Sequence, residues 1–173
     1  MSLLLLAAVA TAAGVIAALL VGSGRRARGP GPRGEPAAAG TDLGFLRARG
    51  AAGLERLLVA LLGELGFTSE RTDRGARTVD VYALDPTPIR GGRAYVRGVL
   101  AEPGEAVSGD DVRAALDLAR AEAIGKVLLV TDGRFSAEAR EAARDQPIEL
   151  LDGDALAALV RRHLPQVWAT RTV

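Results

Sequence analysis

Apolar and polar positions along the first half of the folded part of the chain predict one helix followed by three strands. Leucines recur at steps of 3 and 1 on a single stripe, which predicts a helix over about 51–65. Short runs rich in β-formers, separated by Gly, Pro and Asp, predict strands at 67–72, 78–84 and 93–100. Because short loops separate these runs, we expect the three strands to pair antiparallel.

The second half of the chain predicts two strand–helix units after a further helix. The helix follows Ser108 and ends before Gly125, and the continuous apolar run at 126–131 is typical of a strand buried on both faces. Ser136 is expected to cap a helix that runs to 145, and Asp152 to cap the last helix after a strand at 148–151. A strand, a helix and a strand at this spacing predict a right-handed parallel crossover.

The chain opens with an apolar stretch that predicts a membrane anchor. Residues 2–22 carry no charge over 21 positions, and as a helix they would be about 31 Å long, close to the roughly 30 Å of a bilayer core. A cleaved signal peptide would be shorter and preceded by basic residues. A buried core helix would need a protein around it. Arginines follow the stretch directly, at Arg25, Arg26, Arg28 and Arg33. They favour an uncleaved single-pass anchor over residues 1–23 with the C-terminal domain in the cytoplasm.

Composition divides the rest of the chain into a linker and one domain. Residues 24–50 are rich in Gly, Pro and Arg without apolar periodicity, which predicts a flexible tether, and residues 51–173 form the predicted domain. From residue 41 onward 18 basic residues face 20 acidic ones, so the domain lacks the basic excess of a strong nucleic-acid binder. The absence of cysteine excludes disulfides, thiolate metal sites and cysteine nucleophiles.

Four runs of the domain resemble a known family. GLERLLVALLGELGFTSERT is similar to the opening helix and first strand of the Mrr-like branch of the type IV restriction endonucleases, and TVDVYAL to the strand that carries the family's metal-binding Asp. KVLLVTDGRFSAEAREAA resembles its closing strand–helix unit, and IELLDGDALAALV its final strand and helix. The resemblance covers about residues 53–160 and implies a restriction-endonuclease-like fold, with a mixed central sheet flanked by helices.

The resemblance also implies a catalytic site, which this sequence keeps only in part. The family's helix-borne Glu corresponds to Glu55 and its strand Asp to Asp80, whereas the Gln-x-Lys of the next strand corresponds to Gly98 and Leu100. In an active member Mg²⁺ needs oxygen ligands beside the scissile phosphate, and a Lys polarises the attacking water. Gly98 and Leu100 can supply neither group, and a shift by one residue does not restore the pair. Asp80 is therefore expected to bind a metal only in an active enzyme.

Each candidate residue also has a structural interpretation. Asp80 could pair with Arg93 or Arg97 across the ladder, and an acid at Glu55 suits the first turn of a helix. Rescue of catalysis could come from Glu102 or from Lys126, the single lysine, which also suits a strand end. The turn at 132–134, before the helix capped by Ser136, could bind a phosphate or could simply connect a strand to a helix.

Three functions remain open from the sequence. The first is a membrane-anchored, catalytically degenerate nuclease domain that binds nucleic acid or protein. The second is an active Mg²⁺-dependent DNA endonuclease of the restriction type. The third is a protein-interaction module without nucleic acid, which the negative charge of the domain favours. The sequence does not define the oligomeric state, and no cofactor is expected unless the domain is active.

Overall fold

The computed structural model describes residues 43–89 and 91–169. The predicted membrane helix and most of the predicted linker lie outside these residues. Within the described part, no helix combines the length and the apolar character needed to cross a membrane.

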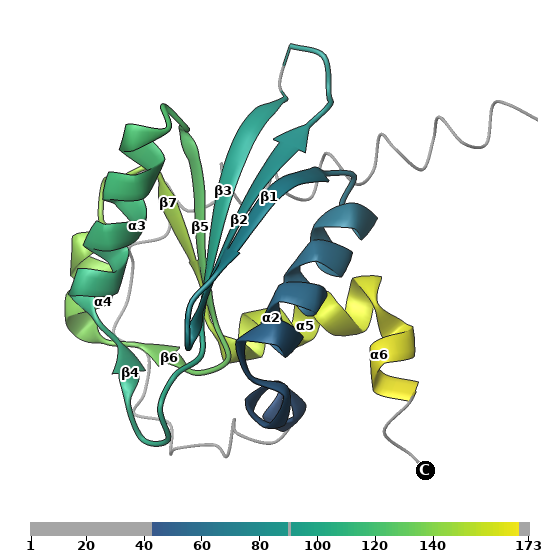
Figure 1. Ribbon diagram of the computed structural model, residues 1–173. Helices are drawn as coiled ribbons and strands as arrows, with labels where there is room; N and C mark the ends of the chain where they lie inside the picture. The colour runs from purple at the N-terminus through teal and green to yellow at the C-terminus, as the bar shows by residue number, and fades with distance from the viewer. Residues whose placement is uncertain (1–42, 90, 170–173) are drawn as a thin grey trace, which may run out of the picture.

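A five-stranded mixed sheet forms the centre of the domain, in the order β1-β2-β3-β5-β7 (Figure 1). Its first three strands pair antiparallel, whereas β3, β5 and β7 pair parallel. A bulge at Glu70 interrupts the register of β1 on β2. Two short strands, β4 and β6, form a separate parallel pair. The strands are β1 (Thr68–Arg74), β2 (Thr78–Asp85), β3 (Gly92–Val99), β4 (Ala106–Val107), β5 (Lys126–Thr131), β6 (Arg134–Phe135) and β7 (Ile148–Leu151). The predicted strands, their antiparallel start and the parallel β5–β7 pair are confirmed.

Helices cover both faces of this sheet, and their ends follow the predicted caps. The hydroxyl of Ser108 and the carboxylate of Asp111 form a reciprocal capping box at the start of α3. Ser136 and Asp152 accept hydrogen bonds from the first turns of α4 and α5. The helix α4 is shorter than predicted because a turn with Asp145 at φ 58° follows it. The helices are α2 (Gly44–Glu64), α3 (Gly109–Ala121), α4 (Ala137–Ala142), α5 (Gly153–His163) and α6 (Pro165–Ala169).

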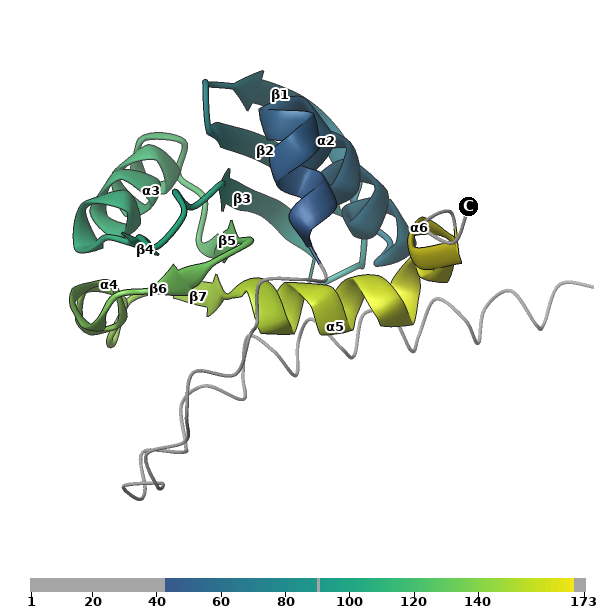
Figure 2. The same cartoon turned by 90° about the horizontal axis from the view of Figure 1, so that it is seen from below.

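The sheet separates two apolar cores, as Figure 2 shows, with α2 and α5 on one side and α3 and α4 on the other. The core under α2 and α5 takes the odd-numbered residues of β2, such as Val79 and Val81, together with the leucine stripe of α2. The core under α3 takes Tyr82 of β2 and Tyr95 and Val99 of β3. Neighbouring residues of a strand therefore belong to different sides of the molecule.

The domain begins earlier than the sequence predicts. Residues 44–49, assigned to the linker, are helical and continue into α2 across Gly50, whose φ of 57° and ψ of −160° break the helical geometry. Leu46 is fully buried, and the Nε of Arg47 donates to the Asp132 carboxylate at 2.9 Å. The prediction of a linker up to residue 50 failed because these tertiary contacts leave no trace in a local Gly- and Arg-rich composition.

Candidate functional site

Asp80 lies at the centre of a small polar cluster on the α3 side of the sheet. It stands directly opposite Arg97 in the antiparallel ladder of β2 and β3. The Tyr95 hydroxyl donates to Asp80 Oδ1 at 2.5 Å, and Arg97 Nη1 lies 3.3 Å from the same oxygen. Arg97 Nη1 also donates to the Tyr95 hydroxyl at 3.3 Å. The predicted cross-strand ion pair of Asp80 is thus confirmed, with Arg97 as the partner.

Burial strengthens the interactions among the three side chains of this cluster. The side chains of Asp80 and Arg97 are 17% and 14% exposed, and Tyr95 is fully buried. Burial, followed by the hydrogen bond to Asp80, raises the pKa of the Tyr95 hydroxyl, which therefore keeps its proton. Burial lowers the pKa of Arg97, but the Tyr95 hydroxyl and the charge of Asp80 outweigh that effect, so its pKa is raised overall. The cluster is a neutral phenol between a carboxylate and a guanidinium.

Gly98 and Leu100 lie on the other side of the sheet, so the structure does not bring them to Asp80. Gly98 pairs with Val79, and a Cβ on Gly98 would lie 2.8 Å from side-chain carbons of Leu54 and Leu58 in α2. Leu100 belongs to the same α2-side core. The residues of β3 that share the face of Asp80 are instead Tyr95, Arg97 and Val99. The two residues matched to the family motif therefore lie on the opposite face of the sheet from Asp80.

Glu55 is also remote from Asp80, because it projects from α2 toward β1 at the edge of the sheet. Its carboxylate accepts from the Thr72 hydroxyl at 2.6 Å and from Arg74 Nη1 at 2.6 Å. The hydrogen bond from Thr72 is the largest influence that lowers the pKa of Glu55. Glu55 lies just beyond the first turn of the helical stretch that follows the break at Gly50. The two acids that match the family are thus held in separate polar clusters.

Neither predicted rescue residue joins Asp80. Lys126 Nζ lies 3.3 Å from Asp85 Oδ2, at the end of β2 that is distant in register from Asp80. Glu102 forms an ion pair with Arg77 in the connections that flank β2 and β3.

Asp132, in the turn predicted as a phosphate site or a plain connection, faces inward. Its side chain is 1% exposed and accepts from the backbone N–H of Ala101 at 2.8 Å as well as from Arg47. A buried carboxylate in this turn favours the structural interpretation, since it ties the ends of β3 and β5 to the start of α2. Neither this contact nor the part of Tyr95 in the Asp80 cluster leaves a local signal in the sequence.

A small apolar cavity of about 60 Å³ lies on the α2 side of the sheet, near the start of β5. It is lined by leucines of α2 and by Phe67, Leu128 and Leu159, with Glu149 among them. Burial raises the pKa of Glu149. The cavity lies on the opposite face of the sheet from Asp80.

The Asp80 cluster does not fit a Mg²⁺ ion. Mg²⁺ requires near-octahedral oxygen ligands, usually including carboxylates, whereas Asp80 is joined by a phenol and a guanidinium. Throughout residues 43–89 and 91–169, no three or more His, Cys, Asp or Glu side chains gather in a way that could hold a metal ion.

Two solved structures share this fold. The first, the MspJI restriction endonuclease in complex with a 27-mer oligonucleotide, is 23% identical with a TM-score of 0.50 over 81% of this chain and 37% of that chain. The second, the DNA modification-dependent restriction endonuclease AspBHI, is 18% identical with a TM-score of 0.53 over 90% of this chain and 46% of that chain. The fold is therefore restriction-endonuclease-like, and the chain spans less than half the length of either neighbour.

A family model of the Mrr catalytic domain, described as a restriction endonuclease, matches residues 46–160, which is more than half of the chain. The chain belongs to the Mrr restriction endonuclease family. The predicted resemblance is confirmed, and the match begins within the segment that the structure adds to the predicted domain. Among curated proteins none matches the chain.

Proposed function

We propose that this protein is a membrane-anchored Mrr-type domain that has lost metal-dependent cleavage and serves as a binding module for nucleic acid or protein. The observation that carries the proposal is the pairing of Asp80 with Arg97. In this position the guanidinium already neutralises the carboxylate that an active member would offer to a metal.

The energetics of the pair support this loss. A divalent ion would have to displace Arg97, whose side chain is 14% exposed, and breaking a buried ion pair costs about 3–5 kcal/mol. The ion would gain one carboxylate and the protonated phenol of Tyr95 in return, because neither Arg97 nor Val99 offers an oxygen and Gly98 and Leu100 face α2. The site therefore lacks both the ligands and the lysine that hydrolysis requires.

Binding of DNA is the first use we propose for the retained fold. The support is the family membership and the fold shared with MspJI, which was solved with an oligonucleotide. The excess of acidic residues after residue 41 limits the electrostatic share of such binding. A protein partner is the alternative within this proposal, and it takes its support from the same charge.

Membrane anchoring rests on the sequence. Residues 2–22 have the length and character of a span, and the arginines that follow favour a cytoplasmic domain in a single-pass cell-membrane protein. A tethered domain would act on molecules that reach the inner face of the membrane.

The alternative function is an active Mg²⁺-dependent restriction endonuclease, which family membership favours. Full-length protein in mild detergent should be incubated with modified and unmodified supercoiled plasmid in Mg²⁺ or Mn²⁺, beside Asp80→Ala. We expect both proteins to leave the plasmid intact. Nicking by the wild type that disappears in Asp80→Ala would establish the active enzyme and overturn the proposal.

A second experiment separates the two kinds of binding. Duplex and single-stranded DNA should be titrated against the full chain at several salt concentrations, because contacts with phosphates give a steep salt dependence. A steep dependence supports nucleic-acid binding. The absence of binding at low salt assigns the module to a protein partner.

A further inference from the structure

The charges on the two helical layers of the domain differ in sign. On α2 and α5 the exposed charged residues are five arginines and two acids: Arg47, Arg49, Arg56, Arg161, Arg162, Glu64 and Asp154. On α3 and α4 they are three arginines and four acids: Arg113, Arg120, Arg140, Asp110, Asp117, Glu138 and Glu141. The two layers lie on opposite sides of the sheet (Figure 2). One broad side of the domain is therefore basic and the other is slightly acidic.

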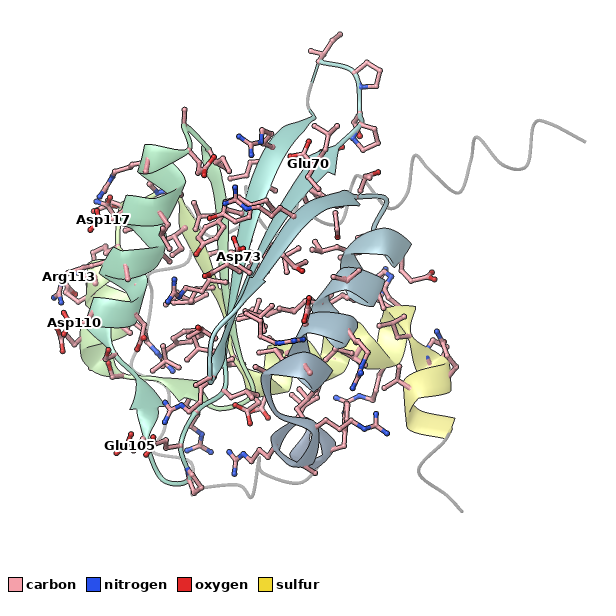
Figure 3. The ribbon with its side chains drawn as sticks, in the orientation of Figure 1. Glu70, Asp73, Glu105, Asp110, Arg113 and Asp117 are labelled. Atoms are coloured by element: carbon pink, nitrogen blue, oxygen red, sulfur yellow. The ribbon has the colours of Figure 1, made fainter. Side chains whose placement is uncertain are left out.

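The acidic layer also neutralises its own arginines. Arg113 lies 2.5 Å from Asp110 and 2.9 Å from Glu138, and Arg120 lies 2.9 Å from Asp117. Figure 3 shows Asp110, Arg113 and Asp117 along the outer side of α3, turned away from the sheet. This surface presents paired charges with an acidic surplus, and it offers little attraction to an anion.

The arginines of the basic layer are less fully compensated. Arg47 forms an ion pair with Asp132. The guanidinium of Arg49 lies 5.7 Å from the ring centre of Phe45, and this contact does not neutralise its charge. Arg56 and Arg162 are exposed on the outer surfaces of their helices. A surplus of arginines over acids on a broad helical surface favours a polyanionic surface as the partner.

The chain enters the domain on this same basic layer. Leu43, the first described residue, and Leu46 pack into the α2-side core, so the chain joins the domain at the start of α2. That segment carries Arg25, Arg26, Arg28 and Arg33 next to the apolar residues 2–22. Arginines close to an anionic leaflet are attracted to it within about one Debye length.

We propose that the outer surface of α2 and α5 lies against the anionic lipid headgroups of the membrane, with α3 and α4 facing away from it. This proposal rests on the membrane anchoring given under Proposed function and adds the orientation of the domain. DNA is the less favoured occupant, because the Asp80 cluster that marks the family's reactive position lies on the α3 side of the sheet. In the docked orientation that side stays open to a partner in solution.

The absence of cysteine from the chain allows a direct test. Full-length protein with a single Ala60→Cys on α2 or Ala121→Cys on α3, both exposed positions, is labelled with an environment-sensitive fluorophore. It is then reconstituted into vesicles of phosphatidylcholine alone or with phosphatidylglycerol, each with a headgroup-linked quencher. We expect the quencher to act strongly at position 60 and weakly at position 121 in the anionic vesicles, and the difference to vanish in high salt or in neutral lipid.

Charge reversal supplies the matched control. Arg49→Glu, Arg56→Glu and Arg162→Glu together should reduce the ratio of docked to undocked domain by about tenfold or more. The control variant carries Arg113→Glu, Arg120→Glu and Arg140→Glu, which change the net charge by the same amount on the other layer. It should leave the ratio of docked to undocked domain unchanged. Circular dichroism verifies that both triple variants remain folded, and single reversals replace any triple that does not.

The outcomes separate the two proposals. Release of the chain from vesicles by alkaline carbonate would show that the anchor itself is wrong. An anchored chain with equal quenching at positions 60 and 121, or equal effects of the two reversals, would overturn the orientation alone. A third outcome is that equimolar duplex DNA displaces position 60 from the lipid, and that the charge reversal on α2 and α5 abolishes this effect of DNA. This outcome would assign the surface to DNA and would also overturn the proposed orientation.

Discussion

The pair of Asp80 and Arg97 can be tested by a double-mutant cycle. The variants are Asp80→Asn, Arg97→Gln and the combination, which remove the charges; Asn keeps the shape of Asp80, and Gln keeps a shorter polar side chain at position 97. Each single change leaves the partner charge largely buried beside Tyr95, whereas the double variant leaves neither. The cycle therefore isolates the interaction between the two charges from the cost of burying each of them.

The geometry sets the size of the effect. At 3.3 Å and an effective dielectric constant of about 20, Coulomb's law gives roughly 5 kcal/mol of gross attraction. Desolvation offsets much of this gain, because both side chains are mostly buried. A single long contact also holds the pair less well than a bidentate one. We expect each single variant to lose about 2–4 kcal/mol of unfolding free energy and the coupling free energy to be about 1–3 kcal/mol.

Urea denaturation of the full chain in mild detergent, followed by circular dichroism, measures these changes. With a slope near 2 kcal/mol per molar urea, single-variant midpoints should fall by about 1–2 M. A coupling below about 0.5 kcal/mol would refute the reasoning. So would a rise of the wild-type midpoint in millimolar Mg²⁺ that Asp80→Asn abolishes, because this result would place a metal rather than Arg97 beside the carboxylate.

Three further changes and one control, Gly63→Ala, test the packing and two inward-facing carboxylates, each by the same urea midpoint. Gly98→Leu should cost about 1–3 kcal/mol or more by overpacking, since even a Cβ meets α2 carbons at 2.8 Å. Gly63→Ala, where a Cβ meets nothing within 4 Å, should instead stabilise the protein by up to about 1 kcal/mol. Equal effects of the two substitutions would contradict the assigned face of β3. Glu149→Gln should stabilise the protein at pH 7 and not at pH 4. The raised pKa of Glu149 in the folded state means that the folded protein binds more protons above the ordinary pKa of 4.5 and loses stability as the pH rises; a gain that is equal at both pH values would rule out this cause. Asp132→Ala should cost about 1–3 kcal/mol, because it leaves the backbone N–H of Ala101 unsatisfied in the interior. A loss below about 0.5 kcal/mol would show that the contact is not structural.

The order of secondary structure could be predicted because each element carries its own local signal. The leucine stripe of α2 and the continuous apolar run of β5 are periodic, and Ser108, Ser136 and Asp152 each cap the helix that follows. These signals depend on neighbours within one or two turns, so no tertiary information was needed. The family resemblance rested on the same elements.

The family motif was matched to the wrong face of β3, and the site depended on that face. Strand β3 is buried on both sides, with Tyr95, Val96 and Val99 all less than 5% exposed, so hydrophobicity alone does not mark one face. The alternation of Arg93, Tyr95 and Arg97 with Ala94, Val96 and Gly98 is the local signal that does. Arg97 and Gly98 are neighbours that point to opposite layers, and a motif aligned one residue away selects the wrong layer. The pairing of Asp80 with Arg97 was nevertheless predictable, because opposite charges that face each other on adjacent strands attract.

The strand β1 forms an outer edge of the sheet, and its composition restricts how copies of the domain can meet. Its seven residues, TSERTDR, include four charged side chains, and the bulge at Glu70 disturbs the regular spacing of its backbone groups. Charged side chains and a bulge discourage a second strand from adding to such a border. Copies crowded together at high local concentration should therefore resist joining their sheets through β1.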